Sequence, residues 1–360
     1  MIGAACPKCG ASGREHCSTT SGRDHRARVL AERDLHPIGT GDVARIVVDE
    51  PGAVDERGGA DTRLQPLLEA VARGLRHLER RRQLELPGTL ELHPDVLQRT
   101  EPWYALRCGL ITASAIGRLI TVRHRTAIEY RCPSCDADVD EPCRSKTRAG
   151  QANKTVHPER TAVAAAERPR SPLILEPADG DDARRVVAIA AAERITGFVD
   201  PTYVSLDMQR GQDDEPFAVG AYDEHHARVV DCGFMVRRWG VFALGYSPDG
   251  LVGADGLVEV KSRRGGTQVE TILSGRVPAE NIAQLQAGLF VSGRRWIDYV
   301  SYAGGMHLWT QRVEPDPLWF NAIRTAVERF EHDVTATVDA YLEAVKDMPL
   351  TERPLLDMVI

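Results

Sequence analysis

Three polar residues near the middle of the chain have the types and spacing of a site that hydrolyses phosphodiesters. In the stretch GYSPDGLVGADGLVEVKS, residues 245–262, Asp249 follows a proline, and Glu259 and Lys261 come ten and twelve residues later. Residues two apart on a strand project from one face, so Glu259 and Lys261 would lie side by side. A hairpin that closes through GADG would bring Asp249 next to them. Two carboxylates and a lysine in this arrangement predict a Mg²⁺ site for phosphodiester cleavage.

The same pattern also fits an ordinary exposed hairpin with a surface ion pair, which adds little to stability. Proline-aspartate, a spacer and glutamate-x-lysine form the signature of the PD-(D/E)xK nucleases, but a motif this short also occurs by chance. Other segments of the chain are therefore needed to distinguish a catalytic site from a surface hairpin.

Six of the eight cysteines fall in two clusters of the same form, in which Cys-Pro-x-Cys is followed by a third cysteine eight residues later and then by a histidine. Three thiolates and one imidazole make a closed tetrahedral Zn²⁺ site. An iron–sulfur cluster is the rival for the cysteines, but it takes four of them. In the first cluster, His16 competes for the place of the fourth ligand. The predicted zinc ligands are Cys6, Cys9, Cys17 and His25 in one site and Cys132, Cys135, Cys143 and His157 in the other.

The elements that must position these residues follow from hydrophobic periodicity. An amphipathic helix is predicted from Leu64 to Leu78, after a segment rich in Gly, Pro and Asp. Residues 101–121 predict a helix, a turn and a second helix that starts near Ser114, a favoured N-cap type. This order of elements predicts a mixed α/β, or α+β, core. Further helices are predicted at 181–196, 211–226, 279–292 and 317–345, and strands within 229–257 and at 296–302 and 307–313.

The composition is that of a globular protein with no membrane span. The chain has 360 residues, of which 42% are hydrophobic, and a formal net charge of -7. It contains no apolar run of the ~18 residues that a membrane span needs, and its N-terminus lacks the pattern of a secretory signal, so we expect a cytoplasmic protein. The acidic total argues against coating of nucleic acid by bulk charge, although a local basic patch can still bind phosphates.

Five separated motifs, in one order, resemble those of the phage lambda exonuclease and related viral-type, YqaJ-like recombination nucleases of the PD-(D/E)xK superfamily. The resemblance covers residues 103–310. It implies a restriction-endonuclease-like core with a central mixed β-sheet flanked by helices, to which two small zinc modules are added. The motifs are WYALRCGLITAS, MQRGQDDEPFA, SPDGLV, EVKS and AQLQAGLFVSGRRWIDYVSY.

The resemblance implies roles for five residues around the predicted metal. Asp249 and Glu259 correspond to the metal ligands, and Glu215 corresponds to a helical carboxylate that supports the metal site. Lys261 corresponds to the catalytic lysine and Gln284 to the glutamine that follows it. Without the resemblance, Glu215 would fit a solvated acidic turn better.

Two further residues correspond to a pocket for a 5′-terminal phosphate. Arg107 and Ser114 would hold that phosphate, since an arginine fork and a hydroxyl at a helix N-terminus bind anions. Their ordinary uses are a helix-surface arginine and an N-cap.

These observations predict a metal-dependent DNA nuclease, in particular a 5′→3′ exonuclease on double-stranded DNA that uses Mg²⁺ or Mn²⁺ in phage-type recombination. One alternative is a structure-specific or restriction-like endonuclease, which needs no 5′-phosphate pocket. Another is a noncatalytic, zinc-dependent DNA-binding factor. The resemblance also suggests a homotrimer and a single-strand annealing protein as partner.

The predicted organisation has a zinc module at 1–35, a linker and amphipathic helix at 36–94, and a nuclease domain at 95–350 with the second zinc module inserted at 131–161. Two interpretations of the modules stay open, contact with DNA phosphates and purely structural support. The basic residues of the second module are Arg131, Arg144, Lys146, Arg148, Lys154 and Arg160.

Overall fold

The computed structural model describes residues 86–145, 148, 151–201 and 204–353. The first cysteine cluster and the helix expected at 64–78 lie outside these residues. In the part that is described, no helix combines the length and the apolar character needed to cross a membrane.

The centre of the fold is a five-stranded mixed sheet with the strand order β10-β9-β8-β7-β4. β8 and β9 are parallel, and the other neighbours are antiparallel. Parallel neighbours need a crossover connection, which α7 (Gly265–Ser274) and α8 (Ala279–Ser292) supply. The strands are β4 (Val229–Val230), β7 (Gly250–Val252), β8 (Gly256–Ser262), β9 (Trp296–Tyr302) and β10 (Trp309–Val313).

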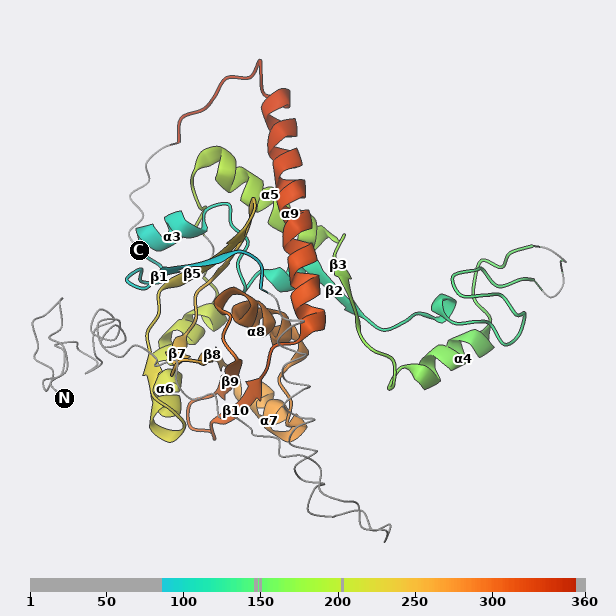
Figure 1. The fold of residues 1–360 in the computed structure, drawn as a ribbon, viewed down its shortest axis with the longest axis horizontal. Coiled ribbons are helices and arrows are strands. Elements are labelled where there is room, and N and C mark those ends of the chain that lie inside the picture. Colours follow the sequence, from blue (N-terminus) through green and yellow to red (C-terminus); the bar gives the residue numbers. More distant parts are fainter. Residues whose placement is uncertain (1–85, 146–147, 149–150, 202–203, 354–360) are drawn as a thin grey trace, which may run out of the picture.

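Helices cover both faces of this sheet (Figure 1). Side chains alternate along β8, so Val258 and Val260 face one side and Leu257 faces the other. The two valines pack with residues of α6 (Leu206–His225), whereas Leu257 belongs to the main core with residues of α8 and α9 (Pro317–Ala344). The sheet therefore lies between α6 on one face and α8 with α9 on the other.

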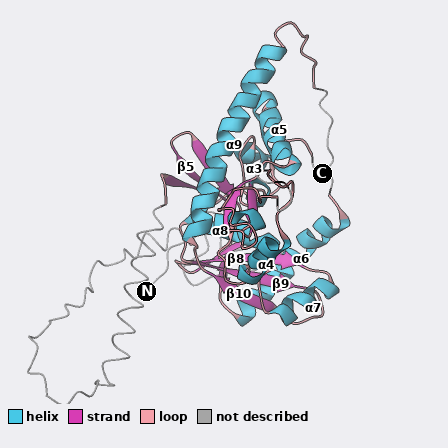
Figure 2. Cartoon of the chain, turned by 90° about the vertical axis from the view of Figure 1, so that its right-hand side faces the viewer, coloured by secondary structure: helices cyan, strands magenta, loops and turns pink. Residues whose placement is uncertain are grey.

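A second, antiparallel sheet has the order β1-β5-β6 and consists of β1 (Thr89–His93), β5 (Phe234–Trp239) and β6 (Phe242–Tyr246). The chain after α3 (Glu101–Arg107) joins β6 through a bridge between Thr112 and Gly245. Helix α5 (Asp181–Thr196) runs beside α9 (Figure 2). These contacts attach the N-terminal part of the described chain to the second sheet and place α5 against α9.

The second cysteine cluster lies in a separate projection that we call the zinc arm, residues 124–173. It is carried by an antiparallel ribbon of β2 (Ile120–Arg123) and β3 (Ile174–Pro177). The arm contains the 3-10 helix η2 (Ala127–Glu129), the cysteines and α4 (Pro158–Glu167). Figure 1 shows it standing out from the body of the protein at the end of the ribbon.

The predicted mixed fold, with a central sheet flanked by helices, is confirmed. Helices α5 and α8 and strand β9 have the predicted bounds, and α6 and α9 differ only at their ends. The second helix expected near Ser114 is wrong. Only the 3-10 helix η1 (Ile116–Leu119) forms there, because Thr112 pairs with β6 just before it and β2 begins just after it.

Several elements, among them β1 and α7, lie where no such element was predicted. Residues 89–93, at the end of the segment expected to be linker and helix, form β1 and pair with β5. Helix α7 starts with two glycines, Gly265 and Gly266, which are typical of loops rather than helices.

Candidate active site and zinc centre

The predicted hairpin is present and places Asp249 beside Glu259. β7 and β8 are antiparallel, with Gly250 opposite Val258, so Asp249 lies at the next position along the ladder, opposite Glu259. The backbone N–H of Val260 donates to Oδ2 of Asp249 at 2.7 Å. This bond fixes the aspartate, which would otherwise sit on a loop, against the strand that carries the other two motif residues.

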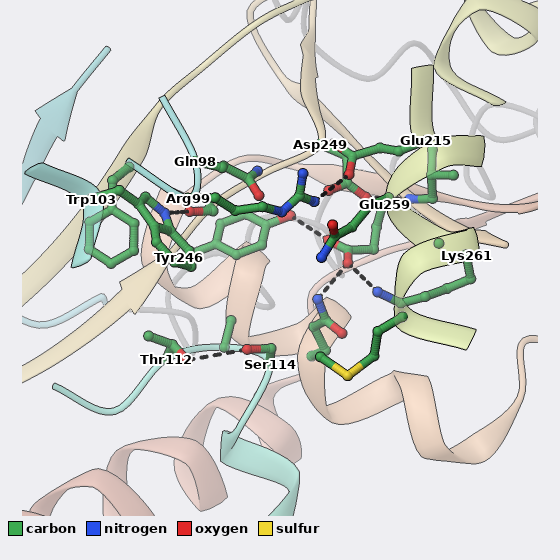
Figure 3. Close-up of a pocket in the computed structure, with 18 of the residues that line it drawn as sticks. Gln98, Arg99, Trp103, Thr112, Ser114, Glu215, Tyr246, Asp249, Glu259 and Lys261 are labelled. Atoms are coloured by element: carbon green, nitrogen blue, oxygen red, sulfur yellow. Dashed lines mark hydrogen bonds and ion pairs between the residues drawn. The ribbon is translucent and has the colours of Figure 1, made fainter. Parts of the chain in front are cut away.

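Glu259 is the best-anchored side chain of the site. It is only 2% exposed. Its Oε1 accepts hydrogen bonds from Nζ of Lys261, at 2.6 Å, and from Nε2 of Gln284 on α8. Its Oε2 accepts one from the hydroxyl of Tyr246, at 3.1 Å, at the end of β6 (Figure 3). Donors from three different elements therefore hold the carboxylate in one orientation.

Crowded charges shift the titration of this group of residues. Burial and repulsion by Glu259 raise the pKa of Asp249 well above its ordinary value, and Lys261 opposes this only in part. For Lys261, burial alone would lower the pKa, but Glu259 and Asp249 together raise it. The lysine is thus held as a cation between two carboxyl groups.

Glu215 lines the same cavity, and its charge adds to the effects that raise the pKa of Asp249. It projects from α6, and its Oε2 accepts a hydrogen bond from Nη2 of Arg99 at 3.2 Å. Among the described residues, only the cysteine cluster has three or more ligand atoms all within 4.8 Å of one another. The three carboxylates are therefore not drawn together into a closed set. Arg99 itself has a φ of 64°, in the left-handed region.

Arg107 and Ser114 line the same cavity as the carboxylates. The guanidinium of Arg107, in the last turn of α3, lies 4.3 Å from the centre of the Trp103 ring. Nε1 of Trp103 donates to Oγ of Ser247 at 2.7 Å, which ties α3 to the loop that carries Asp249. Ser114 is exposed, and its hydroxyl lies 3.2 Å from that of Thr112.

One cavity of about 490 Å³ unites these side chains. All seven residues predicted for the active site line it, from segments far apart in the sequence. Arg99 and Tyr246 also line it and were not predicted from the sequence. Tyr246 could have been found, because it lies in the quoted stretch three residues before Asp249. Arg99 carried no signal, because its partner Glu215 is 116 residues away.

The second predicted zinc site is assembled in the arm. One ligand atom from each of Cys132, Cys135, Cys143 and His157 lies within 4.8 Å of the others. The backbone N–H groups of Arg144 and His157 donate to Sγ of Cys135 and Cys143, both at 3.3 Å. Burial opposes ionisation of Cys135, but the bond from Arg144, together with further hydrogen bonds to the same sulfur, lowers its pKa to about 6.

The histidine of this cluster is oriented by a neighbour. Nδ2 of Asn153 lies 3.2 Å from Nε2 of His157, while Nδ1 of the same ring lies 3.4 Å from Sγ of Cys132. The ring thus presents Nδ1 to the sulfurs, while Nε2 faces the side-chain amide of Asn153. Three sulfurs and one nitrogen fit Zn²⁺ rather than an iron–sulfur cluster.

Arg160 has a different role from the phosphate contact considered for the basic residues of the module. It is fully buried, and its guanidinium donates to four backbone carbonyls of the arm. It therefore holds together the loops around the cysteines and has no surface to offer to a phosphate. The four acceptors are the carbonyl oxygens of Ile128, Tyr130, Asp138 and Glu141.

The fold and the site together define a class of protein. A mixed sheet flanked by helices, with an aspartate ahead of one strand and Glu-x-Lys on its antiparallel neighbour, is the arrangement of the PD-(D/E)xK type.

Comparison with known families narrows this class. Residues 179–295 match the YqaJ-like viral recombinase domain. Residues 97–173 match a putative DNA-binding phage zinc finger domain, which starts ahead of the insertion predicted at 131–161 and includes α3. The resemblance to viral-type recombination nucleases is thereby confirmed. No curated protein matches the chain.

Several solved structures are similar to this chain. An alkaline exonuclease from Laribacter hongkongensis is 24% identical, with a TM-score of 0.49, and the match covers 68% of this chain and 98% of that one. The structure of the same enzyme in complex with dAMP is also 24% identical, with a TM-score of 0.48, and covers the same 68% of this chain and 98% of that one. A phage-related exonuclease from Haemophilus somnus is 11% identical, with a TM-score of 0.35, over 64% of this chain and 96% of that one.

Proposed function

We propose that this protein is a divalent-metal-dependent deoxyribonuclease that degrades double-stranded DNA from its 5′ ends. The observation that carries the proposal is the cavity in which Asp249, Glu259 and Lys261 face Arg107 and Ser114. Carboxylates with a lysine provide for phosphodiester hydrolysis, and an arginine with a hydroxyl provides for binding of a phosphate. The match to a viral recombinase domain supports this interpretation.

The carboxylates fit a hard divalent cation. Asp249 and Glu259 are adjacent oxygen donors, and repulsion between their charges contributes to the raised pKa of Asp249. Glu215, at the edge of the cavity, would support the same site. Mg²⁺ bound there would polarise the scissile phosphate and activate a water molecule, and Mn²⁺ would substitute for it.

The protein's own groups would position the substrate. Lys261 carries a positive charge on the same face as Glu259, where it would stabilise the charge that develops on the phosphate. Gln284 and Tyr246 hold the two oxygens of Glu259 in place. Arg107 and Ser114 would bind the terminal 5′-phosphate and so fix which phosphodiester lies next to Lys261.

The proposed enzyme comprises a nuclease domain, residues 95–350, to which β1 adds a strand, and a zinc module between β2 and β3. Cys132, Cys135, Cys143 and His157 would bind one Zn²⁺ there. We propose a second Zn²⁺ on Cys6, Cys9, Cys17 and His25, which zinc analysis of the full chain would count. A homotrimer is part of the proposal, and light scattering in solution would measure it. A single-strand annealing protein is the proposed partner, which co-purification would test.

The decisive experiment compares three DNA substrates in Mg²⁺: a linear duplex with 5′-phosphate ends, the same duplex with 5′-hydroxyl ends, and covalently closed circular DNA. We expect rapid digestion of the first, slower digestion of the second and none of the third. Cleavage of closed circles would indicate an endonuclease instead. No digestion of any substrate under conditions where the protein binds DNA would indicate a noncatalytic DNA-binding factor.

A further inference from the structure

Three of the basic residues around the zinc cluster, Arg131, Arg144 and Arg160, are already engaged within the arm. Arg131 lies 3.4 Å from Asp136 and 3.9 Å from Asp138, and Arg144 lies 3.6 Å from Glu141. Arg160 is buried on backbone carbonyls. The tip of the arm therefore offers less free positive charge than its sequence suggests.

A groove at the base of the arm, in contrast, is lined by arginines that form no ion pair among the described residues. It has a volume of about 350 Å³ and lies between the chain that leaves β2 and one side of α4. Its floor is made of small side chains, Ala127, Ala164 and Ala165. Its polar lining consists of His124, Arg125, Thr161 and Arg168.

The two arginines of this groove are uncompensated. No carboxylate in the part of the chain that the structure describes lies within ion-pair distance of Arg125 or Arg168, and both are exposed. The neighbouring Arg123, by contrast, is held by Glu129 at 2.8 Å and Glu176 at 2.7 Å. Glu129 and Glu176 are thus paired with Arg123 rather than with Arg125 or Arg168.

Two free guanidinium groups that line one groove suit an anion with several acceptor oxygens. His124 and Thr161 border the same groove. The alanine floor leaves room for such a group to approach α4.

We propose that this groove, lined by His124, Arg125, Thr161 and Arg168, binds the phosphate backbone of duplex DNA away from the active-site cavity. The choice of DNA as the anion rests on the proposed nuclease function. The chain as a whole is acidic, with a net charge of -7. Attraction to DNA phosphates would therefore have to come from a local patch of free cations such as this one. The arm thus contacts the duplex through its base, and the zinc cluster supports that surface.

The test measures binding of a linear duplex by the full-length Lys261→Ala protein as salt is varied, so that digestion does not interfere. Removal of one contact to a phosphate should reduce the slope of log affinity against log salt by about 0.9. For Arg125→Ala/Arg168→Ala we expect a slope smaller by roughly 2 and, because the affinities converge near 1 M salt, an affinity lower by roughly 50- to 100-fold at 0.1 M salt. Arg125→Lys/Arg168→Lys should keep most of the slope.

Arg131→Ala is the matched control, because that arginine is already paired with carboxylates, and its slope should equal the parent's. Zinc content and circular dichroism establish that each variant is folded. An unchanged slope in the double alanine variant, or a parent that does not bind duplex DNA, would overturn the proposal. Digestion by the wild-type protein is scored separately, so a reduced slope without any digestion would contradict the nuclease function and leave the groove standing.

Discussion

Nζ of Lys261 lies 2.6 Å from Oε1 of Glu259, two residues away on the same strand, and that oxygen also accepts a hydrogen bond from Gln284. The lysine is thus fixed by a neighbour on its own strand and shares that neighbour with a helix of the crossover connection. The contact that fixes the charge of Lys261 lies within strand β8, and Gln284 of helix α8 holds the same oxygen of Glu259 in place.

Replacing this lysine tests its catalytic role. Lys261→Ala removes the positive charge beside the scissile phosphate, and we expect the rate of duplex digestion in Mg²⁺ to fall by about 100- to 1000-fold. Affinity for the duplex should change far less. Lys346→Ala, at an exposed lysine paired with Glu343 near the end of α9, serves as control and should digest DNA at the wild-type rate. Equal rates for both variants would remove Lys261 from the mechanism.

The 5′-phosphate pocket can be tested through substrate preference. Arg107→Ala should reduce the preference for 5′-phosphate over 5′-hydroxyl ends by about 10- to 100-fold, because a charged hydrogen bond to the phosphate is removed. The measurement is the ratio of initial rates on the two duplexes. Arg118→Ala, an exposed arginine on η1, should keep the wild-type ratio. A ratio unaffected by Arg107→Ala would place the phosphate elsewhere.

The hydrogen bond from Tyr246 to Glu259 predicts a cost in stability. Tyr246→Phe leaves the buried Oε2 of Glu259 without its donor, and we expect the free energy of unfolding without added Mg²⁺ to fall by about 1–3 kcal/mol. Urea denaturation measures this. Tyr341→Phe, at a tyrosine that is 43% exposed, should leave the unfolding free energy unchanged. If the two variants unfold alike, the hydroxyl of Tyr246 does not support the carboxylate.

Replacing Asp249 should change stability and activity in opposite directions. Asp249→Asn keeps an oxygen that can accept the N–H of Val260 but removes a charge that repels Glu259. We expect digestion to be abolished, while the protein without added Mg²⁺ becomes more stable by about 0.5–2 kcal/mol. A clear loss of stability would show that the aspartate is a structural rather than a functional residue.

The zinc arm predicts a change in metal content. Cys135→Ser should lower the zinc content by one ion per chain and make the arm sensitive to proteolysis, because the cluster organises loops with few apolar residues. Cys108→Ser changes a cysteine outside the cluster and should keep the wild-type zinc content. Elemental analysis of the two proteins decides this, and equal zinc contents would count against the site.

The active-site hairpin could be predicted because its information is local. Proline, glycine and alternating apolar residues fix the turn and the faces of two short strands, and the spacing of Asp249, Glu259 and Lys261 follows from them. The ladder between β7 and β8 has the register that this spacing requires. Helices α5 and α8 were predicted for the same reason, since their periodicity and their terminal glycines lie within one segment.

What could not be predicted depends on contacts between distant segments. β1 is recognised as a strand only through its pairing with β5, which lies far along the chain, and Arg99 only through Glu215. Arg160 has the sequence appearance of a surface cation, yet backbone carbonyls from several segments of the arm surround it. Burial rather than spacing decides between phosphate contact and structural support for this residue, and burial cannot be read from the sequence.

The ribbon that carries the zinc arm pairs Arg123 with Ile174, so the chain leaves the body and returns to it at nearly the same point. An insertion whose ends are neighbours adds no strain to the fold that hosts it. The arm is therefore exchangeable in principle: a short turn between β2 and β3 would close the ribbon and leave the nuclease core intact. A different substrate-binding module could be joined to the same two strands, so that one catalytic core could be combined with different binding modules.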